Sequence, residues 1–193
     1  MKKVLLVTFS DNADHQDISF GMFESIYMSE SDNCNIWIMG INNPKVPVMD
    51  TPHTHLVDCP KRPGIEKKTF DIRELHKIIK WINSQSFDVI FFETLHVWNL
   101  AIMMFCHKNT VIFQMIHDLI PHKGDKQEKS VHLMNKAVCK LADYIVLCNE
   151  KYVSKVRKFM VYHRREFASL ICGGDFRGIQ NLAIQDGFYS LDE

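Results

Sequence analysis

Short apolar segments rich in β-branched and aromatic residues alternate along this chain with segments of helical periodicity. Strands are expected at 3–9, 34–40, around 54–58, 87–94, 109–116, 143–149 and 167–172. Several of these segments are continuously apolar, which is typical of strands buried on both faces. Strands separated by helices at this spacing pair in parallel through right-handed crossovers. The sequence therefore predicts an α/β fold: a doubly wound, mostly parallel sheet of about six to seven strands with helices on both faces.

Helical periodicity fills the intervals between these strands. Helices are expected at 20–29, 71–86, 98–107, 126–141 and 150–160. The segment 71–86 carries apolar residues at helical spacing, and Asp71 followed by Glu74 is typical of a helix N-terminus. The stretch 41–69 contains five prolines and is expected to be irregular apart from its one short strand.

Length and composition predict a single globular domain. The chain has 193 residues, of which 46% are apolar and 24% charged, so it can bury a core and is not disordered. Residues 1–172 are expected to form the sheet domain, and 173–193 a C-terminal tail or helix packed on it or on a partner. The formal net charge is zero, so no nucleic-acid partner is expected.

Charge is nevertheless unevenly distributed. The segment 123–165 holds eleven Lys and Arg against four Asp and Glu, whereas 166–193 holds one against five. A local basic surface can attract anionic lipid or phosphate even on a neutral protein. The alternative interpretation, a solvated helix face, stays open.

The cysteines and the N-terminus indicate the cytoplasm. Six cysteines lie far apart without a CxxC pair, and several stand inside apolar runs, as free buried thiols do in a reducing compartment. The apolar run after Lys2 and Lys3 reaches charged residues too soon for a signal peptide, and no apolar stretch approaches the roughly 20 residues that span a bilayer. A cytoplasmic protein is expected, with peripheral contact at the inner face of the membrane through 123–165 as a further option.

Ligands of open parallel sheets bind outside the carboxyl ends of the strands, so the loops there hold the candidate site residues. Four such loops are polar: 10–17, 93–98, 117–122 and 149–151. The first has neither GxGxxG nor GxxxxGK[ST], so neither a nicotinamide fingerprint nor a P-loop is present and no cofactor is expected.

Three aspartates in the first loop, Asp11, Asp14 and Asp17, are either helix-capping and loop residues or carboxylates that grip a hydroxyl-rich ligand. His15 stands among them. Together with Asn149 of the last loop, Asp11, Asp14 and His15 are substrate-binding candidates.

The loop 93–98 supplies two further substrate-binding candidates, Glu93 and His96. A glutamate at a strand end could accept a hydrogen bond from a sugar hydroxyl or act as a general base. Trp98 could stack on a sugar ring, but an aromatic residue at a helix start more often belongs to the core.

His117 and Asp118 are the candidate catalytic residues, because an imidazole at a rigid strand end can act as a base or donate to a phosphate. The alternative is a turn that begins at Asp118 beside a buried, hydrogen-bonded histidine. His53 and His55 form an HxH pattern of the kind that binds zinc, with Cys59 nearby. Without a convincing fourth ligand, no metal site is expected.

One stretch of the chain resembles a known family. Residues 117–150 read HDLIPHKGDKQEKSVHLMNKAVCKLADYIVLCNE. This order of strand, His-Asp, Pro/Gly loop, helix and strand is similar to the N-terminal domain of GT-B glycosyltransferases of the family 4 type, which assemble bacterial surface polysaccharides. The lead-in FDVIFFETLHVWNLAI and the opening MKKVLLVTFS are also similar. The resemblance covers most of 1–172, being strong in 87–155 and weak in 41–69.

The resemblance implies a Rossmann-like domain that takes the acceptor, often a polyprenyl-diphosphate-linked sugar, opposite a second domain that binds the nucleotide sugar. It implies that His117 faces the donor near the reaction centre, with Asp118 beside it, and that 123–165 approaches anionic lipid. The expected partners are thus a sugar or lipid-linked sugar acceptor and a donor-binding glycosyltransferase domain or subunit, since no second domain follows in these 193 residues.

One loop departs from the family pattern. The Gly-rich turn that usually follows the first strand is absent, because SDNADHQDISFG offers only Gly21. A non-catalytic module that binds carbohydrate or lipid phosphate, or a truncated inactive transferase, is the alternative function. A small hydrolase is disfavoured, because no GxSxG motif is present and no cysteine pairs visibly with a histidine at a strand end.

Overall fold

A computed structural model of the chain describes residues 1–29, 34–62, 66–117, 128–147 and 167–169. Several predictions fall outside these residues: Asp118, Asn149, the helix at 150–160 and the tail 173–193. Of the basic segment 123–165, the structure describes 128–147.

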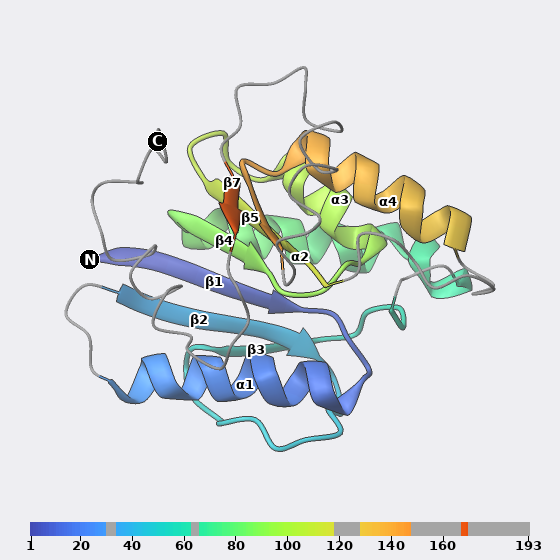
Figure 1. The fold of residues 1–193 in the computed structure, drawn as a ribbon. Coiled ribbons are helices and arrows are strands. Elements are labelled where there is room, and N and C mark those ends of the chain that lie inside the picture. The colour runs from blue at the N-terminus through green and yellow to red at the C-terminus, as the bar shows by residue number, and fades with distance from the viewer. Residues whose placement is uncertain (30–33, 63–65, 118–127, 148–166, 170–193) are drawn as a thin grey trace.

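The described residues build one seven-stranded sheet in the order β3-β2-β1-β4-β5-β6-β7, and every neighbouring pair is parallel (Figure 1). The strands are β1 (Lys2–Thr8), β2 (Cys34–Ile41), β3 (Thr54–Val57), β4 (Val89–Phe92), β5 (Val111–Ile116), β6 (Tyr144–Leu147) and β7 (Phe167–Ser169). The predicted fold class, a doubly wound parallel sheet of the Rossmann-like type, is confirmed.

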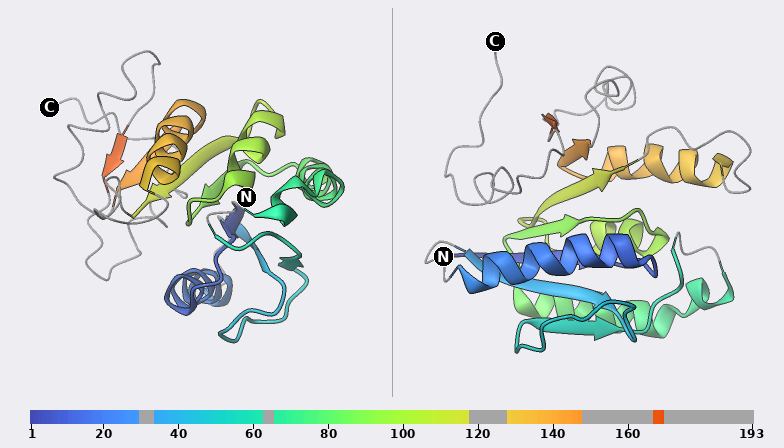
Figure 2. Two further views of the ribbon diagram at one scale, coloured as in Figure 1. Left: turned by 90° about the vertical axis from the view of Figure 1, so that its right-hand side faces the viewer. Right: turned by 60° about the horizontal axis from the view of Figure 1, so that its bottom comes forward.

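Helices cover both faces of this sheet. They are α1 (Ala13–Met28), α2 (Ile72–Gln85), α3 (Val97–Phe105) and α4 (Glu128–Leu141), with a short 3-10 helix, η1 (Lys67–Phe70), before α2. Figure 2 shows α1 on one side of the sheet and the other three α-helices on the opposite side. This two-sided arrangement follows from right-handed crossovers that leave the centre of the sheet in opposite directions.

The point of reversal lies between β1 and β4, which are adjacent in the sheet with Leu5 opposite Ile90. From β1 the chain proceeds to β2 and β3 on one side, and from β4 to β5 and β6 on the other. The carboxyl ends of two strands that diverge in this way are where ligands of such sheets bind, and the crevice named below is this place at the ends of β1 and β4. The polar loops predicted at these ends therefore meet at the centre of the sheet.

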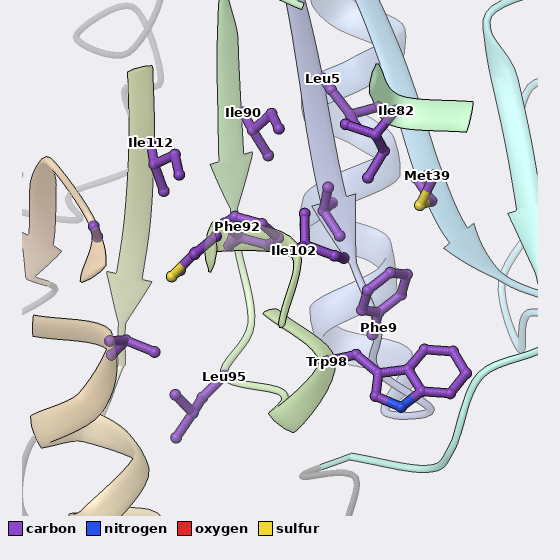
Figure 3. Packing of buried hydrophobic residues seen from close by; sticks show 14 of the residues in the cluster. Leu5, Phe9, Met39, Ile82, Ile90, Phe92, Leu95, Trp98, Ile102 and Ile112 are labelled. Carbon is purple, nitrogen blue, oxygen red and sulfur yellow. The ribbon is translucent and has the colours of Figure 1, made fainter. Parts of the chain in front are cut away.

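The larger of two apolar clusters lies between the sheet and helices α2, α3 and α4. In Figure 3, Phe9 and Trp98 lie close together below the ends of the central strands, with Ile102 between them and Phe92. The indole of Trp98 is 1% exposed, and its Nε1 donates to the carbonyl of Thr69 at 3.1 Å. Trp98 is thus a core residue, as the second interpretation of the sequence had it, and its ring does not offer a stacking surface to a sugar.

Helix α1 begins earlier than predicted, at Ala13 rather than at residue 20. The reason is Asn12, whose side chain accepts a hydrogen bond from the backbone N–H of Asp14 at 2.8 Å and so satisfies a free donor of the first turn. His15 therefore projects from the first turn of a helix rather than from a loop. This early start brings it to the crevice.

The predicted start of α2 is confirmed. Asp71 is the N-cap residue and accepts a hydrogen bond from the backbone N–H of Glu74 at 3.1 Å. The carboxylate of Glu74 does not return that bond but pairs with Lys77 at 2.9 Å. Among the helices that the structure describes, none combines the length and the apolar composition that crossing a membrane requires.

Candidate functional site

A buried carboxylate forms the centre of the candidate site. Glu93 directly follows β4, and its backbone N–H donates to the carbonyl of Val7 in β1 at 3.0 Å. Its side chain is 1% exposed, at the point where β1 and β4 diverge. Burying a charge is costly unless it is paired and hydrogen-bonded, so the surroundings of Glu93 must supply donors.

Three side chains supply these donors. The Oε1 atom of Glu93 lies 2.7 Å from Nε2 of His117 and 3.2 Å from Nδ1 of His15, and the hydroxyl of Thr8 donates to Oε2 at 3.4 Å. Thr8 ends β1, His117 follows β5 and His15 belongs to α1. The ends of β1, β4 and β5 and the first turn of α1 therefore meet at one carboxylate.

The hydrogen bonds outweigh the cost of burial. Burial alone would raise the pKa of Glu93, but the hydrogen bonds from His117 and His15, with the positive charge that each ring has when it is protonated, lower the pKa to about 2. The carboxylate is therefore ionised at any physiological pH. It is a fixed negative charge under the crevice.

The position of the proton on His117 follows from its neighbours. Its Nε2 atom lies 2.7 Å from the carboxylate of Glu93 and 3.1 Å from the backbone carbonyl of the same residue. Both are acceptors, so Nε2 must carry the proton. In a neutral imidazole, Nδ1 is then the basic nitrogen, which is the arrangement by which a carboxylate orients a catalytic histidine.

His15 has the opposite tautomer, and Arg62 determines it. The Nη1 atom of Arg62 lies 2.8 Å from Nε2 of His15. A guanidinium has donors only, so Nε2 must accept and the proton of the imidazole is on Nδ1, from which it reaches Glu93. His15 is thus a neutral link between a cation and an anion. Its ring also packs edge-on against that of His117, with centroids 4.7 Å apart.

A buried amide network fixes the backbone beneath Glu93. The Nδ2 atom of Asn99 donates to the carbonyl of Thr94 at 2.7 Å and to Oε1 of Gln114 at 3.1 Å. The Nε2 atom of Gln114 lies within 3.3 Å of the carbonyls of Phe92, Thr94 and Met115. All the donors come from α3 and β5, so the turn after β4 is tied to both of its neighbours.

His96 lies outside the group formed by Glu93, His117 and His15, and its hydrogen bonds are structural. It is fully buried, its Nδ1 accepts from the backbone N–H of Trp98 at the start of α3, and its Nε2 donates to the carbonyl of Pro60 at 3.1 Å. Burial lowers the pKa of His96 to about 4. The hydrogen bond to Pro60 raises the pKa and the charge of Arg62 lowers it, and both effects are smaller than that of burial. Both ring nitrogens are engaged, so His96 holds the loop 58–62 on α3.

The structure brings together three of the predicted site residues, Glu93, His117 and His15. Asp14 is exposed in the first turn of α1 and Asp11 is partly buried before it, and neither contacts the carboxylate of Glu93 among the hydrogen bonds of the described residues. Asp118 and Asn149 lie outside the described residues.

Sequence reasoning missed Arg62 and Gln114. Arg62 lies in the irregular stretch 41–69, where no local pattern indicates that a side chain returns to the crevice. Gln114 did leave a signal, because it is a polar residue inside the apolar strand VIFQMI. A polar side chain at the centre of a fully buried strand must find partners, and this one holds the turn of Glu93.

The residues that could bind a metal ion in the structure are not those of the HxH pattern, His53 and His55. His53 stacks on Trp37 with ring centroids 4.4 Å apart, and His55 stacks on Trp81 at 4.1 Å, so both rings belong to an aromatic layer. Within the described ranges, the residues that could hold a metal ion are His15, Glu93 and His117, whose nearest ligand atoms all lie within 4.8 Å of one another. The sequence did not indicate this group.

Comparisons with known proteins leave the family open. No model of a known family matches the chain, and no curated protein matches it. Among solved structures, MurG of Acinetobacter baumannii is similar, with a TM-score of 0.35 and 8% identity over 96% of this chain and 72% of MurG. The Rapid Encystment Protein 24 KDa of Francisella tularensis has a TM-score of 0.34 and 15% identity over 88% of this chain and 84% of its own. Neither similarity is close enough to carry an argument about function.

Proposed function

We propose that the chain is the acceptor-side domain of a GT-B type sugar transferase. In this proposal it binds a sugar acceptor in the crevice between β1 and β4 and works with a domain or subunit that binds the nucleotide sugar. The support is threefold: the family 4 resemblance of 87–155, the doubly wound parallel sheet, and a polar group at the carboxyl ends of its central strands.

The observation that carries the proposal is the contact of His117 with Glu93. The carboxylate accepts a hydrogen bond from Nε2–H of the imidazole at 2.7 Å and so fixes the orientation of the ring. An imidazole oriented in this way can accept the proton of a sugar hydroxyl as that hydroxyl attacks the anomeric carbon of the donor sugar and the nucleoside diphosphate leaves. The buried negative charge of Glu93 would stabilise the imidazolium that results.

The proposal also specifies the chemical class of the acceptor. A lipid-diphosphate-linked sugar of surface polysaccharide or glycolipid assembly is the acceptor that the sequence resemblance implies. Lys129 and Lys140 are exposed on α4, in the basic segment that would approach such an anionic acceptor or the membrane that carries it.

The test is a calorimetric titration of the purified chain, in buffer containing EDTA, with two classes of ligand. The first class is a short-chain polyprenyl-diphosphate-linked sugar, and the second comprises UDP, GDP and their sugar conjugates. We expect heat of binding with the first class and none with the second. Binding that is confined to the nucleotide class would place the donor site on this chain and overturn the proposal.

Two variants locate the site. His117→Ala removes the proposed base and should weaken acceptor binding, whereas His107→Ala, at the opposite end of the strands, should leave it unchanged. Acceptor binding that is equally strong in both variants would show that the crevice is not the acceptor site. Binding lost in His117→Ala, but no transfer when a donor-binding partner is supplied, would favour a non-catalytic binding module.

A further inference from the structure

The three side chains that meet at the crevice also form a ligand set for a metal ion. His15 offers Nδ1, Glu93 offers Oε1 and His117 offers Nε2, and these atoms lie within 4.8 Å of one another. Each is mounted on a different element: the first turn of α1, the end of β4 and the end of β5. Two imidazoles and one carboxylate are the donors that zinc and related divalent metals use in proteins.

Two of the three separations are close to those of ligand atoms around a bound ion. Bonds of about 2.0–2.2 Å in a tetrahedral arrangement place ligand atoms roughly 3.3–3.5 Å apart. The distances from Oε1 of Glu93 are 2.7 Å to Nε2 of His117 and 3.2 Å to Nδ1 of His15, so small movements of the two imidazoles would bring these two pairs to that spacing. Their side chains are 22% and 15% exposed, which gives an ion access from the crevice, whereas that of Glu93 is 1% exposed.

Protons lie between the three proposed ligand atoms, and Arg62 contacts the other nitrogen of His15, Nε2. Nδ1 of His15 and Nε2 of His117 both carry hydrogen atoms that point to Glu93, as their partners require. Metal coordination needs the lone pairs of these two nitrogens, so the proton of each neutral imidazole must move to its other nitrogen. For His15 the other nitrogen is Nε2, which accepts from Arg62 and cannot do so once it is protonated.

We propose that His15, Glu93 and His117 form a site for a divalent transition metal of the zinc type, and that Arg62 competes with the metal. The arginine holds His15 in the tautomer that cannot bind the ion, and its positive charge opposes that of the ion. Metal uptake therefore releases Arg62 from His15. Three protein ligands leave at least one coordination position for water or for an oxygen of a bound ligand.

This inference does not depend on the proposed function, since it concerns uptake of an ion by the free chain. The two proposals are linked at one contact, because a metal bound to Nε2 of His117 would displace the hydrogen bond that orients this ring on Glu93. The acceptor titration is performed with a chelator and the metal titration without acceptor. Failure of either one leaves the other standing.

The experiment is a titration of the full chain, freed of any affinity tag, with ZnCl2, followed by calorimetry. We expect one ion per chain, with affinity weakened on the order of tenfold or more in His15→Ala, His117→Ala and Glu93→Gln. His76→Ala, on an exposed face of α2, and His53→Ala, in the aromatic layer, are controls that should bind as the parent chain does. Absence of binding at 100-fold excess of ion, or loss of binding in His53→Ala instead, would overturn the proposal.

A second pair of variants tests the competition without removing a ligand. Arg62→Met removes the donor and the charge and should bind zinc more tightly, by at least about threefold, whereas Lys61→Met removes an adjacent exposed charge and should not. Co2+ bound to the parent chain in place of zinc gives a visible spectrum that reports its ligands. This readout remains even if a ligand variant fails to fold. A spectrum of nitrogen and oxygen ligands supports the site, and a thiolate charge-transfer band would assign the ion to cysteines and contradict it.

Discussion

The Nε2 atom of His117 lies 2.7 Å from the carboxylate of Glu93, although 24 residues separate them in the chain. They meet because β4 and β5 are adjacent parallel strands whose carboxyl ends fall at the same edge of the sheet. The carboxylate is buried and ionised, so the imidazole is a necessary partner and not an incidental neighbour.

Replacing Glu93 or His117 should lower the free energy of unfolding, and the two losses should not be additive. Glu93→Gln replaces the negative charge that both histidines contact at Oε1 with a neutral amide, and His117→Ala leaves the carboxylate with fewer donors. We expect each to lower the free energy of unfolding by about 1–3 kcal/mol, with a coupling energy of at least ~1 kcal/mol between them. Urea denaturation of the two single variants and the double variant measures this. Strictly additive losses would mean that the two side chains do not interact in solution.

The contact of Arg62 with His15 makes a prediction about tautomers. In the parent chain, nitrogen NMR of the imidazoles should show the proton of His15 on Nδ1 and that of His117 on Nε2, because their partners require it. Arg62→Met removes the partner of Nε2 only, so the proton of His15 should stay on Nδ1 beside Glu93 while the signal of Nε2 shifts. Lys61→Met should leave the pattern unchanged. Finding the same tautomer on both histidines in the parent chain would contradict the geometry.

The sequence predicted the sheet because its signals are local. Apolar runs such as 87–94 and 109–116 indicate buried strands by themselves, and the helices between them require parallel pairing. The start of α2 at Asp71 was predictable for the same reason, because a cap acts on its own first turn. The start of α1 was not, since the asparagine that caps it stands among aspartates that could equally have ended a loop.

The candidate site was predictable only in part. Glu93 and His117 could be named, because strand ends in a parallel sheet converge whatever the sequence between them. That His15 would join them on Glu93 depends on where α1 begins and on its angle to the sheet. That Arg62 would reach His15 depends on the path of an irregular loop. Such contacts are tertiary, so no periodicity along the chain records them.

Gln114 should contribute more to stability than its apolar neighbours on the same strand. Gln114→Leu would leave the carbonyls of Phe92 and Thr94 with fewer donors in the interior, at a cost of about 2–3 kcal/mol in the free energy of unfolding. Ile112→Val, which trims one buried methyl group from β5, is the matched control and should cost about 1 kcal/mol. Chemical denaturation compares the two. A Gln114→Leu chain as stable as the parent would show that the amide network does not hold this turn.

His96 should make the fold sensitive to mild acid. Its Nδ1 accepts from the N–H of Trp98 and its Nε2 donates to Pro60, so the neutral ring is fully satisfied and a second proton would break the cap of α3. Burial lowers the pKa of His96 to about 4 from the ordinary value of 6.5. A group whose pKa is lower in the folded state than in the unfolded state stabilises the fold fully above pH 6.5, and this contribution is lost as the pH falls from 6.5 towards 4.

The expected loss is on the order of 3 kcal/mol across this interval, from a shift between about 6.5 and about 4. His96→Asn isolates it, because asparagine is a good N-cap residue but does not titrate. The difference in free energy of unfolding between the parent chain and His96→Asn should shrink steadily from pH 6.5 to pH 4. His107→Ala, which removes an exposed histidine, should follow the parent profile. A difference that stays constant over this range would mean that His96 does not take up a proton on unfolding, and that another group causes any acid sensitivity of the fold.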